Sequence, residues 1–240
     1  MGYRVAARFR GPPGCGNGGY VAGLAALLLG DGAAEVTLRK PVPLDVDLDV
    51  VREGERALVQ DAAGTLIVEA RPSDPALEVP AAPTREEAAA ATRWFQTAPG
   101  FSHSTGLCFA CGNDPADGFG LRVFSGKVAG RPGVAAALWR PEAAFGDASG
   151  NVAPEFLWAA LDCPGQFAFT VNEGPARSLL ARMTGRLDGP VRVGEECIVL
   201  GWQIAREGRK LHAGTAIFGA DGGIRGVARA LWVMPPPVAA

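Results

Sequence analysis

Polar and apolar residues alternate along the segment PLDVDLDVV at residues 43–51. Its apolar positions run from Leu44 to Val50, and aspartates at positions 45, 47 and 49 separate them. This period of two predicts a strand with one buried face and one solvated face. Turn residues follow at 52–54 and 61–64, and the apolar segments RALVQ and TLIVEA come after them. The pattern predicts an antiparallel meander with no helix between its strands.

Two other segments are apolar nearly all the way around a helix. They are GYVAGLAALLL at residues 19–29 and PEFLWAALD at residues 154–162. A helix with no polar face must be covered on all sides, and a curved antiparallel sheet wrapped around it provides that cover. The remaining predicted strands are YRVAARF in the first half and GVAAALWRP, LLARMTGRL, ECIVLGWQIA, KLHAGTAIFG and GVARALWVM in the second. Each half therefore combines one helix with its own set of strands.

A proline-rich segment separates the two halves. Prolines at 72, 75, 80 and 83 mark the end of the first unit, and TREEAAAATRWF follows. Thr84 and Glu87 have the spacing of a capping box, which predicts a connecting helix. We expect an N-terminal unit at 1–75, a linker with a helix and a cysteine-containing loop at 76–115, and a C-terminal unit at 116–240.

Composition narrows the classes of function. The 240 residues carry a formal net charge of −2 and 20% charged residues, so no basic field points to nucleic acid. No apolar run reaches the roughly 18 to 20 residues that span a bilayer. The start, MGYRVAARFRG, lacks the apolar region of a signal peptide. We therefore expect a cytoplasmic protein.

Five cysteines are scattered along the chain, which disfavours a disulfide framework. Only Cys108 and Cys111 form a C-x-x-C pair, and no second pair follows at zinc-ribbon spacing. His103 offers a third metal ligand, but a fourth is not evident. The pattern favours a structured loop with two small apolar side chains, and it favours Cys163 as a buried, inert thiol. We expect no metal and no cofactor.

Glycines at 14, 16 and 19 spell the G-x-G-x-x-G of a dinucleotide-binding turn. That fold needs strands alternating with helices and an acidic residue about twenty positions on. Glu35 has about that spacing, but a meander follows the helix, and Pro12 and Pro13 fit poorly in a tight turn between strand and helix. The dinucleotide reading is therefore the weaker one.

The segment GNGGYVAGLAALLL, followed by VTLRKPVPLDVDLDVV, an R-x-G turn and ALVQDAAGTLIVEA, resembles the N-terminal half of double-hotdog acyl-CoA thioesterases. The stretch from CFACGNDPADGFGLRVFSG through WAALDCPG to ARALWV resembles a second hotdog half. The resemblance implies an α+β double hotdog, in which two curved antiparallel sheets each wrap around one central apolar helix. It also implies an acyl-CoA substrate bound at the seam between the two helices, a link to fatty acid metabolism, and leaves a homodimer open.

Two departures from the family pattern bear on catalysis. Many hotdog thioesterases start the helix with His-Gly-Gly, whereas this chain has Asn17-Gly18-Gly19 and, in its second half, Ala153-Pro154-Glu155. The bacterial double-hotdog enzymes also use a Gln near their last strand, where this chain reads ARALWV. The catalytic residues of the family therefore do not carry over as a complete set.

Asp162 is the first candidate for the catalytic acid or base. It ends an otherwise apolar segment, and burial of a lone carboxylate is costly. We expect the helix to end near Cys163-Pro164, so that burial and the helix C-terminus both raise the pKa of Asp162. That carboxylate would activate water or attack the thioester carbonyl. The alternative is a purely structural role, in which Asp162 accepts hydrogen bonds in the turn before Pro164.

Other residues are candidates for catalysis or substrate binding beside Asp162. Glu155 lies two helical turns earlier, on nearly the same face of the expected helix. It is either a second catalytic acid or a carboxylate that stabilises the first turn through the helix dipole. Thr184 is a candidate for positioning water by resemblance. Gly18, Gly19 and Tyr20 open the first helix, whose free N–H groups would face the thioester oxygen, and Asn17 caps the helix or orients the thioester. Trp158 is either an acyl-tunnel residue or core.

The leading hypothesis is hydrolysis of an acyl-CoA thioester to free acid and CoA. The alternative is a non-catalytic module that binds acyl-CoA or another hydrophobic ligand, and an enoyl-CoA hydratase is third. No G-x-S-x-G motif points to a serine hydrolase. Coenzyme A phosphates would favour basic residues at the rim, and the available ones are Arg39, Lys40, Arg182 and Arg186.

Overall fold

The computed structural model describes residues 2–101, 106–113 and 118–236. Its strands form one 11-stranded sheet in the order β1-β3-β4-β5-β2-β8-β11-β10-β9-β7-β6. Every strand pair in the described chain is antiparallel. This arrangement excludes the dinucleotide-binding fold, which requires a parallel sheet.

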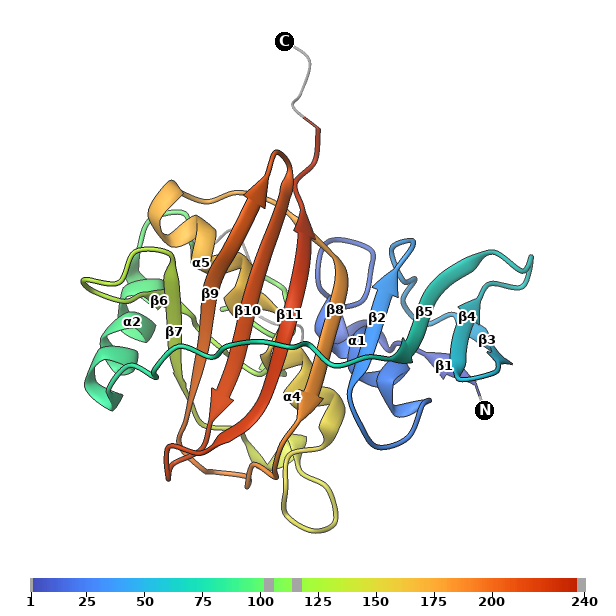
Figure 1. Cartoon of the computed structure of the whole chain (residues 1–240), viewed down its shortest axis with the longest axis horizontal. Helices are drawn as coiled ribbons and strands as arrows, with labels where there is room; N and C mark the ends of the chain where they lie inside the picture. The colour runs from blue at the N-terminus through green and yellow to red at the C-terminus, as the bar shows by residue number, and fades with distance from the viewer. Residues whose placement is uncertain (1, 102–105, 114–117, 237–240) are drawn as a thin grey trace.

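The first half provides one end of the sheet (Figure 1). Its elements are β1 (Tyr3–Arg4), the 3-10 helix η1 (Ala7–Phe9), α1 (Gly18–Leu27), β2 (Ala34–Leu38), β3 (Asp47–Glu53), β4 (Arg56–Gln60) and β5 (Leu66–Pro72). The predicted meander is present, because β3 pairs with β4 and β4 pairs with β5. Gly54 has a φ of 60° in the turn between β3 and β4, a conformation that favours glycine.

The second half provides the other end. Its elements are α2 (Arg85–Thr97), β6 (Gly126–Lys127), β7 (Val134–Trp139), the 3-10 helix η3 (Ala143–Phe145), α4 (Pro154–Ala160), α5 (Cys163–Glu173), β8 (Leu179–Leu187), β9 (Cys197–Glu207), β10 (Lys210–Phe218) and β11 (Ile224–Val233). The capping box predicted for α2 is present, because Thr84 accepts from the Glu87 N–H and the Glu87 side chain accepts from the Thr84 N–H.

The two halves join edge to edge through β2 and β8. Ala34 pairs with Gly185 and Thr37 with Arg182 in an antiparallel register. The two expected sheets are therefore continuous. This pairing also brings together the loops and helices that precede the two strands.

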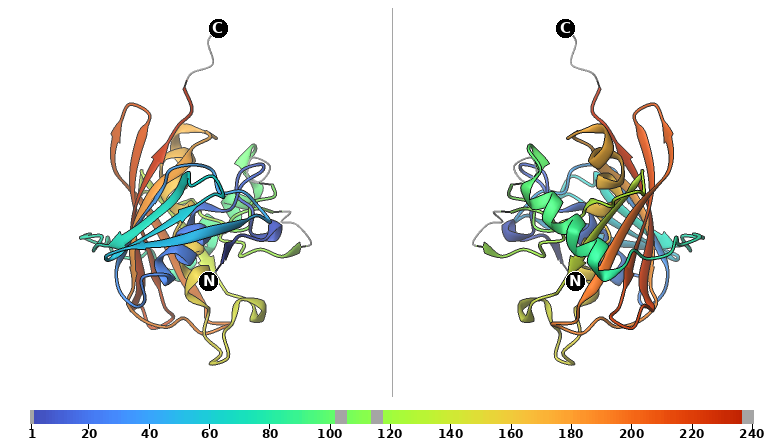
Figure 2. Two further views of the ribbon diagram at one scale, coloured as in Figure 1. Left: turned by 90° about the vertical axis from the view of Figure 1, so that its right-hand side faces the viewer. Right: turned by 90° about the vertical axis from the view of Figure 1, so that its left-hand side faces the viewer.

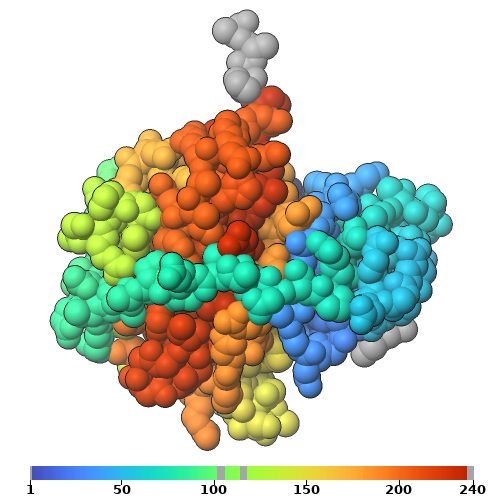
Figure 3. All heavy atoms as spheres, in the orientation of Figure 1, coloured from blue at the N-terminus to red at the C-terminus, as the bar shows by residue number. Residues whose placement is uncertain are grey.

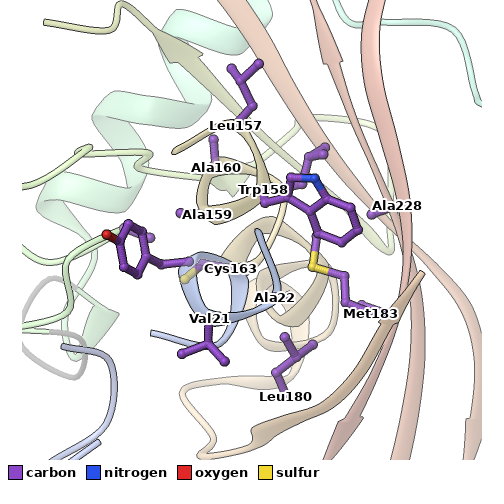
Figure 4. Packing of buried hydrophobic residues seen from close by; sticks show 14 of the residues in the cluster. Val21, Ala22, Leu157, Trp158, Ala159, Ala160, Cys163, Leu180, Met183 and Ala228 are labelled. Atoms are coloured by element: carbon purple, nitrogen blue, oxygen red, sulfur yellow. The ribbon is translucent and has the colours of Figure 1, made fainter. Parts of the chain in front are cut away.

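Helices α1, α4 and α5 lie against one face of the sheet (Figure 2). α1 packs closely on α4, and a Cβ at Gly23 would lie 2.7 Å from the Glu155 Cα. Figure 4 shows the core between the helices and the sheet, where Trp158 of α4 lies over Met183 of β8 and beside Ala228 of β11. The close approach of two apolar helices therefore depends on a small residue at position 23.

Residues 73–84 run across the opposite face of the sheet as an extended strap (Figure 3). Arg229 donates to the Ala76 carbonyl at 3.0 Å, and Leu77, Val79 and Ala82 pack on a second apolar cluster that includes Phe218. The linker thus shields apolar side chains on the outer face of β9, β10 and β11 from solvent.

Two sequence predictions for the first half are wrong in part. The expected strand YRVAARF is a strand only at Tyr3–Arg4. The chain then turns into η1, which places Phe9 on Tyr20 with ring centroids 4.1 Å apart. Val46 is 44% exposed, because β3 begins only at Asp47 and the preceding Asp45 has a φ of 58°.

The helix expected in the second half is confirmed as α4, but the expectation of a single helix there is wrong, because a second one follows it. α4 ends at Ala160, and α5 begins at Cys163 with Pro164 in its first turn. Proline lacks an N–H, and the first turn of a helix needs none. The residue read as a terminator therefore sits at the start of a new helix.

Candidate active site

Asp162 lies in the joint between α4 and α5, buried to 1% exposure. Its Oδ2 accepts a hydrogen bond from the Gly19 N–H at 2.9 Å and one from the Asn17 Nδ2 at 3.1 Å. No described residue hydrogen-bonds to Oδ1. One oxygen is therefore anchored, and the other is buried without a hydrogen-bond partner among the described residues.

The N-terminus of α1 provides the anchor. Asn17 caps the helix, since its Oδ1 accepts from the Tyr20 N–H at 2.9 Å, while its Nδ2 reaches Asp162. Asn17 therefore has the capping role expected from the sequence and also holds Asp162, while its role in orienting the thioester stays a prediction. A Cβ at Gly19 would lie 2.5 Å from the Asp162 Cβ and 2.6 Å from the Trp158 carbonyl oxygen. Only glycine permits this approach.

Burial raises the pKa of Asp162 to about 7. The Cys108 side chain adds to this increase, while the hydrogen bonds from Gly19 and Asn17 oppose it. The expected contribution of a helix C-terminus is wrong, because Asp162 occupies the N-cap position of α5, where a helix dipole favours an anion. Desolvation is therefore the main cause of the raised pKa, and a pKa of about 7 leaves both the protonated and the ionised form present near neutral pH.

Glu155 does not share a helix with Asp162. It lies in the first turn of α4, which ends at Ala160. Burial is the main cause that raises the pKa of Tyr20 to about 12, and the charge of Glu155 adds to this increase. The argument that placed Glu155 and Asp162 on one helical face is therefore wrong. The favourable position of an acid in a first turn still applies to Glu155.

Thr184 lies on β8 with its hydroxyl 3.4 Å from Glu35 Oε2. Its neighbours Met183 and Gly185 face Trp158 and the helices, and successive side chains in a strand point to opposite faces. The structure therefore places Thr184 on the face of the sheet opposite Asp162. The prediction that it positions water at the site is wrong.

Tyr20 and Trp158 are buried in the core, with exposures of 7% and 3%. Tyr20 stacks on Phe9 and Phe156. Gly18 lies against β8, because a Cβ on it would be 2.9 Å from Leu180. These residues form the wall around the α1 N-terminus.

Three of the four basic residues proposed for the rim, Arg39, Arg182 and Arg186, are engaged in ion pairs. Arg39 pairs with Glu69, and Arg182 pairs with Glu35. Both pairs line a polar surface cavity of about 360 Å³ over β2, β4, β5 and β8. Arg186 pairs with Asp74 of the strap and with Asp188.

Three cysteines gather next to Asp162. The sulfur atoms of Cys108, Cys111 and Cys163 all lie within 4.8 Å of one another, and the Asn17 Nδ2 lies 3.8 Å from the Cys108 Sγ. Hydrogen bonds from Cys111 and Cys163 hold the pKa of Cys108 below its usual range. Sequence reasoning missed that Cys163 joins the C-x-x-C pair, and the only signal for it was its position beside Asp162. His103 lies outside the described residues.

No helix in the described part of the chain is long and apolar enough to cross a membrane. No protein-family model matches the sequence, and no curated protein matches it.

Solved structures do match. One is a protein from Novosphingobium aromaticivorans named as a thioesterase, with a TM-score of 0.62, 10% identity, and coverage of 98% of this chain and 94% of that one. Another is the tesB protein of Mycobacterium avium subsp. paratuberculosis, with a TM-score of 0.59, 14% identity, and coverage of 97% and 91%. At these identities the likeness concerns the fold. The chain therefore has the double-hotdog fold, in the arrangement found in these two structures.

Proposed function

We propose that this protein hydrolyses an acyl-CoA thioester to a free acid and CoA. The observation that carries the proposal is the anchored carboxylate of Asp162, whose Oδ2 is fixed by Gly19 and Asn17 while Oδ1 has no partner among the described residues. The fold shared with thioesterase structures supports the same reaction class.

In this proposal Asp162 acts as a general base. Oδ1 accepts a proton from a water molecule as the water oxygen bonds to the thioester carbon. The carbon–sulfur bond then breaks, and the CoA thiolate leaves and takes up the proton. The N–H groups of Gly19 and Tyr20 already donate to Asp162 and Asn17, so the Gly18 N–H at the start of α1 is the group that stabilises the negative oxygen of the intermediate. Asn17 and Gly19 hold the carboxylate, in place of the His-Gly-Gly start of related sequences.

A second candidate function is ligand binding without catalysis. The observation that favours it is the 1% exposure of Asp162, because water and thioester must both reach a catalytic base. The choice between hydrolysis and binding is therefore one for experiment.

The test measures free thiol released from a panel of short, long and aromatic acyl-CoA substrates. It compares the native protein with Asp162→Asn and determines binding of CoA by calorimetry in parallel. The proposal expects thiol release by the native protein and its loss in Asp162→Asn with CoA binding retained. Binding by both proteins with thiol release at the background rate would establish the binding module instead.

A further inference from the structure

The cysteine group combines two parts of the chain that are far apart in sequence. Cys108 and Cys111 belong to the loop that follows α2, and Cys163 is the first residue of α5. In a tetrahedral zinc site each zinc–sulfur bond is about 2.3 Å long. Any two sulfur ligands of the ion therefore lie about 3.8 Å apart. The mutual distances within 4.8 Å are compatible with that spacing.

The backbone of the loop is shaped around the Cys108 sulfur. The backbone N–H groups of Ala110 and Cys111 help to lower the pKa of the Cys108 thiol, and the Gly112 N–H closes the turn on the Cys108 carbonyl at 2.8 Å. A Cβ at Gly112 would lie 2.5 Å from that same carbonyl oxygen, so this tight turn requires glycine. Successive N–H groups directed at one point favour a negative charge there, which suits a thiolate.

The loop is also held rigidly against the rest of the protein. The Phe109 N–H donates to the Arg10 carbonyl at 2.8 Å, and the Val123 N–H donates to the Ala110 carbonyl at 2.9 Å. The Phe109 ring is fully buried and packs on Phe9 and Tyr20. The sulfur atoms are therefore positioned before any ligand arrives, which reduces the entropy that binding must overcome.

We propose that Cys108, Cys111 and Cys163 bind a zinc ion through three thiolates. Thiolate ligands select thiophilic metals, and zinc takes tetrahedral sulfur sites without redox chemistry. Each thiol releases its proton to solvent when its sulfur bonds to the metal. Among the described residues, the group of mutually close ligand atoms consists of these three sulfurs, and a water molecule completes the four-coordinate shell.

The site ties the linker loop to the first turn of α5. Asp162 immediately precedes Cys163, and Asn17 contacts both Asp162 and Cys108. The metal would therefore hold the backbone around Asp162 and Asn17 in position. The inference stands on the cysteine geometry and does not depend on thioester hydrolysis. It reverses the expectation from the sequence that the protein binds no metal. That expectation arose because only two of the three ligands, Cys108 and Cys111, are close in sequence.

The experiment measures the metal content of the full-length protein by elemental mass spectrometry. The protein is purified in reducing buffer, incubated with zinc and passed through a desalting column. Native protein and Cys15→Ser, a control outside the cluster, should each retain about one zinc ion per chain. Cys108→Ser and Cys163→Ser should retain none above background. Native protein with no more zinc than Cys163→Ser would overturn the proposal, including the case in which mass mapping finds a Cys108–Cys111 disulfide.

A second measurement covers variants that fail to fold. Cobalt replaces zinc in the native protein, and the absorption spectrum is recorded. Three thiolate ligands predict an intense thiolate-to-cobalt charge-transfer band and the visible bands of a tetrahedral ion. A spectrum without these features would overturn the proposal, because it would show that the sulfurs do not bind the metal.

Discussion

The backbone N–H of Gly19 donates to the Asp162 carboxylate at 2.9 Å across 143 residues of sequence. Gly19 belongs to the helix of the first half, and Asp162 to the helix joint of the second. The contact depends on the edge-to-edge pairing of β2 with β8 and on the packing of α1 against α4. The candidate site therefore exists only where both halves of the double hotdog are assembled.

Gly19→Ala should destabilise the protein strongly. The added methyl group would lie 2.5 Å from the Asp162 Cβ and 2.6 Å from the Trp158 carbonyl, and overpacking of a tight interior costs about 1–3 kcal/mol or more. Unfolding in urea measures the loss. Gly189→Ala is the control, because its added Cβ meets only Arg225 at 3.5 Å. Equal stability of the two variants would contradict the close contact at Gly19.

Asn17→Asp should separate the two roles of this side chain. Aspartate keeps an oxygen for the Tyr20 N–H, so the helix cap survives. The Nδ2 donor that lies 3.1 Å from Asp162 Oδ2 is replaced by an acceptor, which leaves two buried carboxyl groups in contact. The expected cost in unfolding free energy is about 1–3 kcal/mol, and thiol release should fall with it. A variant as stable and active as the native protein would show that the Asn17 donor has no role.

Glu196 should make a pH-dependent contribution to stability. Hydrogen bonding to Arg85 of α2 lowers the pKa of this carboxyl below its usual value, and Arg140 adds to the effect. A carboxyl with a lowered pKa in the folded state stabilises the protein above its unfolded pKa, and the stabilisation disappears as the pH falls through the folded pKa.

The measurement compares the native protein with Glu196→Gln in urea at several pH values. The native protein should be the more stable one at pH 7, and the difference should shrink towards zero in acid. A difference that stays constant over this range would mean that the ion pairs of Glu196 do not stabilise the fold.

Local patterns predicted those elements whose causes are local. The alternation in residues 47–50 and the turn at Gly54 produced the β3–β4 hairpin, and Thr84 with Glu87 produced the capping box of α2. Asp162 was recognisable because a carboxylate in an apolar segment requires an explanation. In each case neighbouring residues alone determine the outcome.

Other features depend on contacts between distant segments. The face on which Thr184 lies follows from the pairing of β8 with β2 and β11, which no local pattern reveals. Cys163 joins Cys108 and Cys111 only because the linker loop lies against α5. Pro164 was ambiguous because proline both follows helices and occupies their first turn.

The most direct test of the account compares kcat and KM for acyl-CoA hydrolysis in Asp162→Asn and Asp188→Asn. Asp188 lies outside the site and pairs with Arg186, so its substitution controls for the loss of a carboxylate. General-base catalysis predicts a fall in kcat of about 10²–10⁴-fold for Asp162→Asn, with KM little changed, and native kinetics for Asp188→Asn. A kcat for Asp162→Asn within a few-fold of the native value would contradict the assignment of Asp162 as the catalytic base.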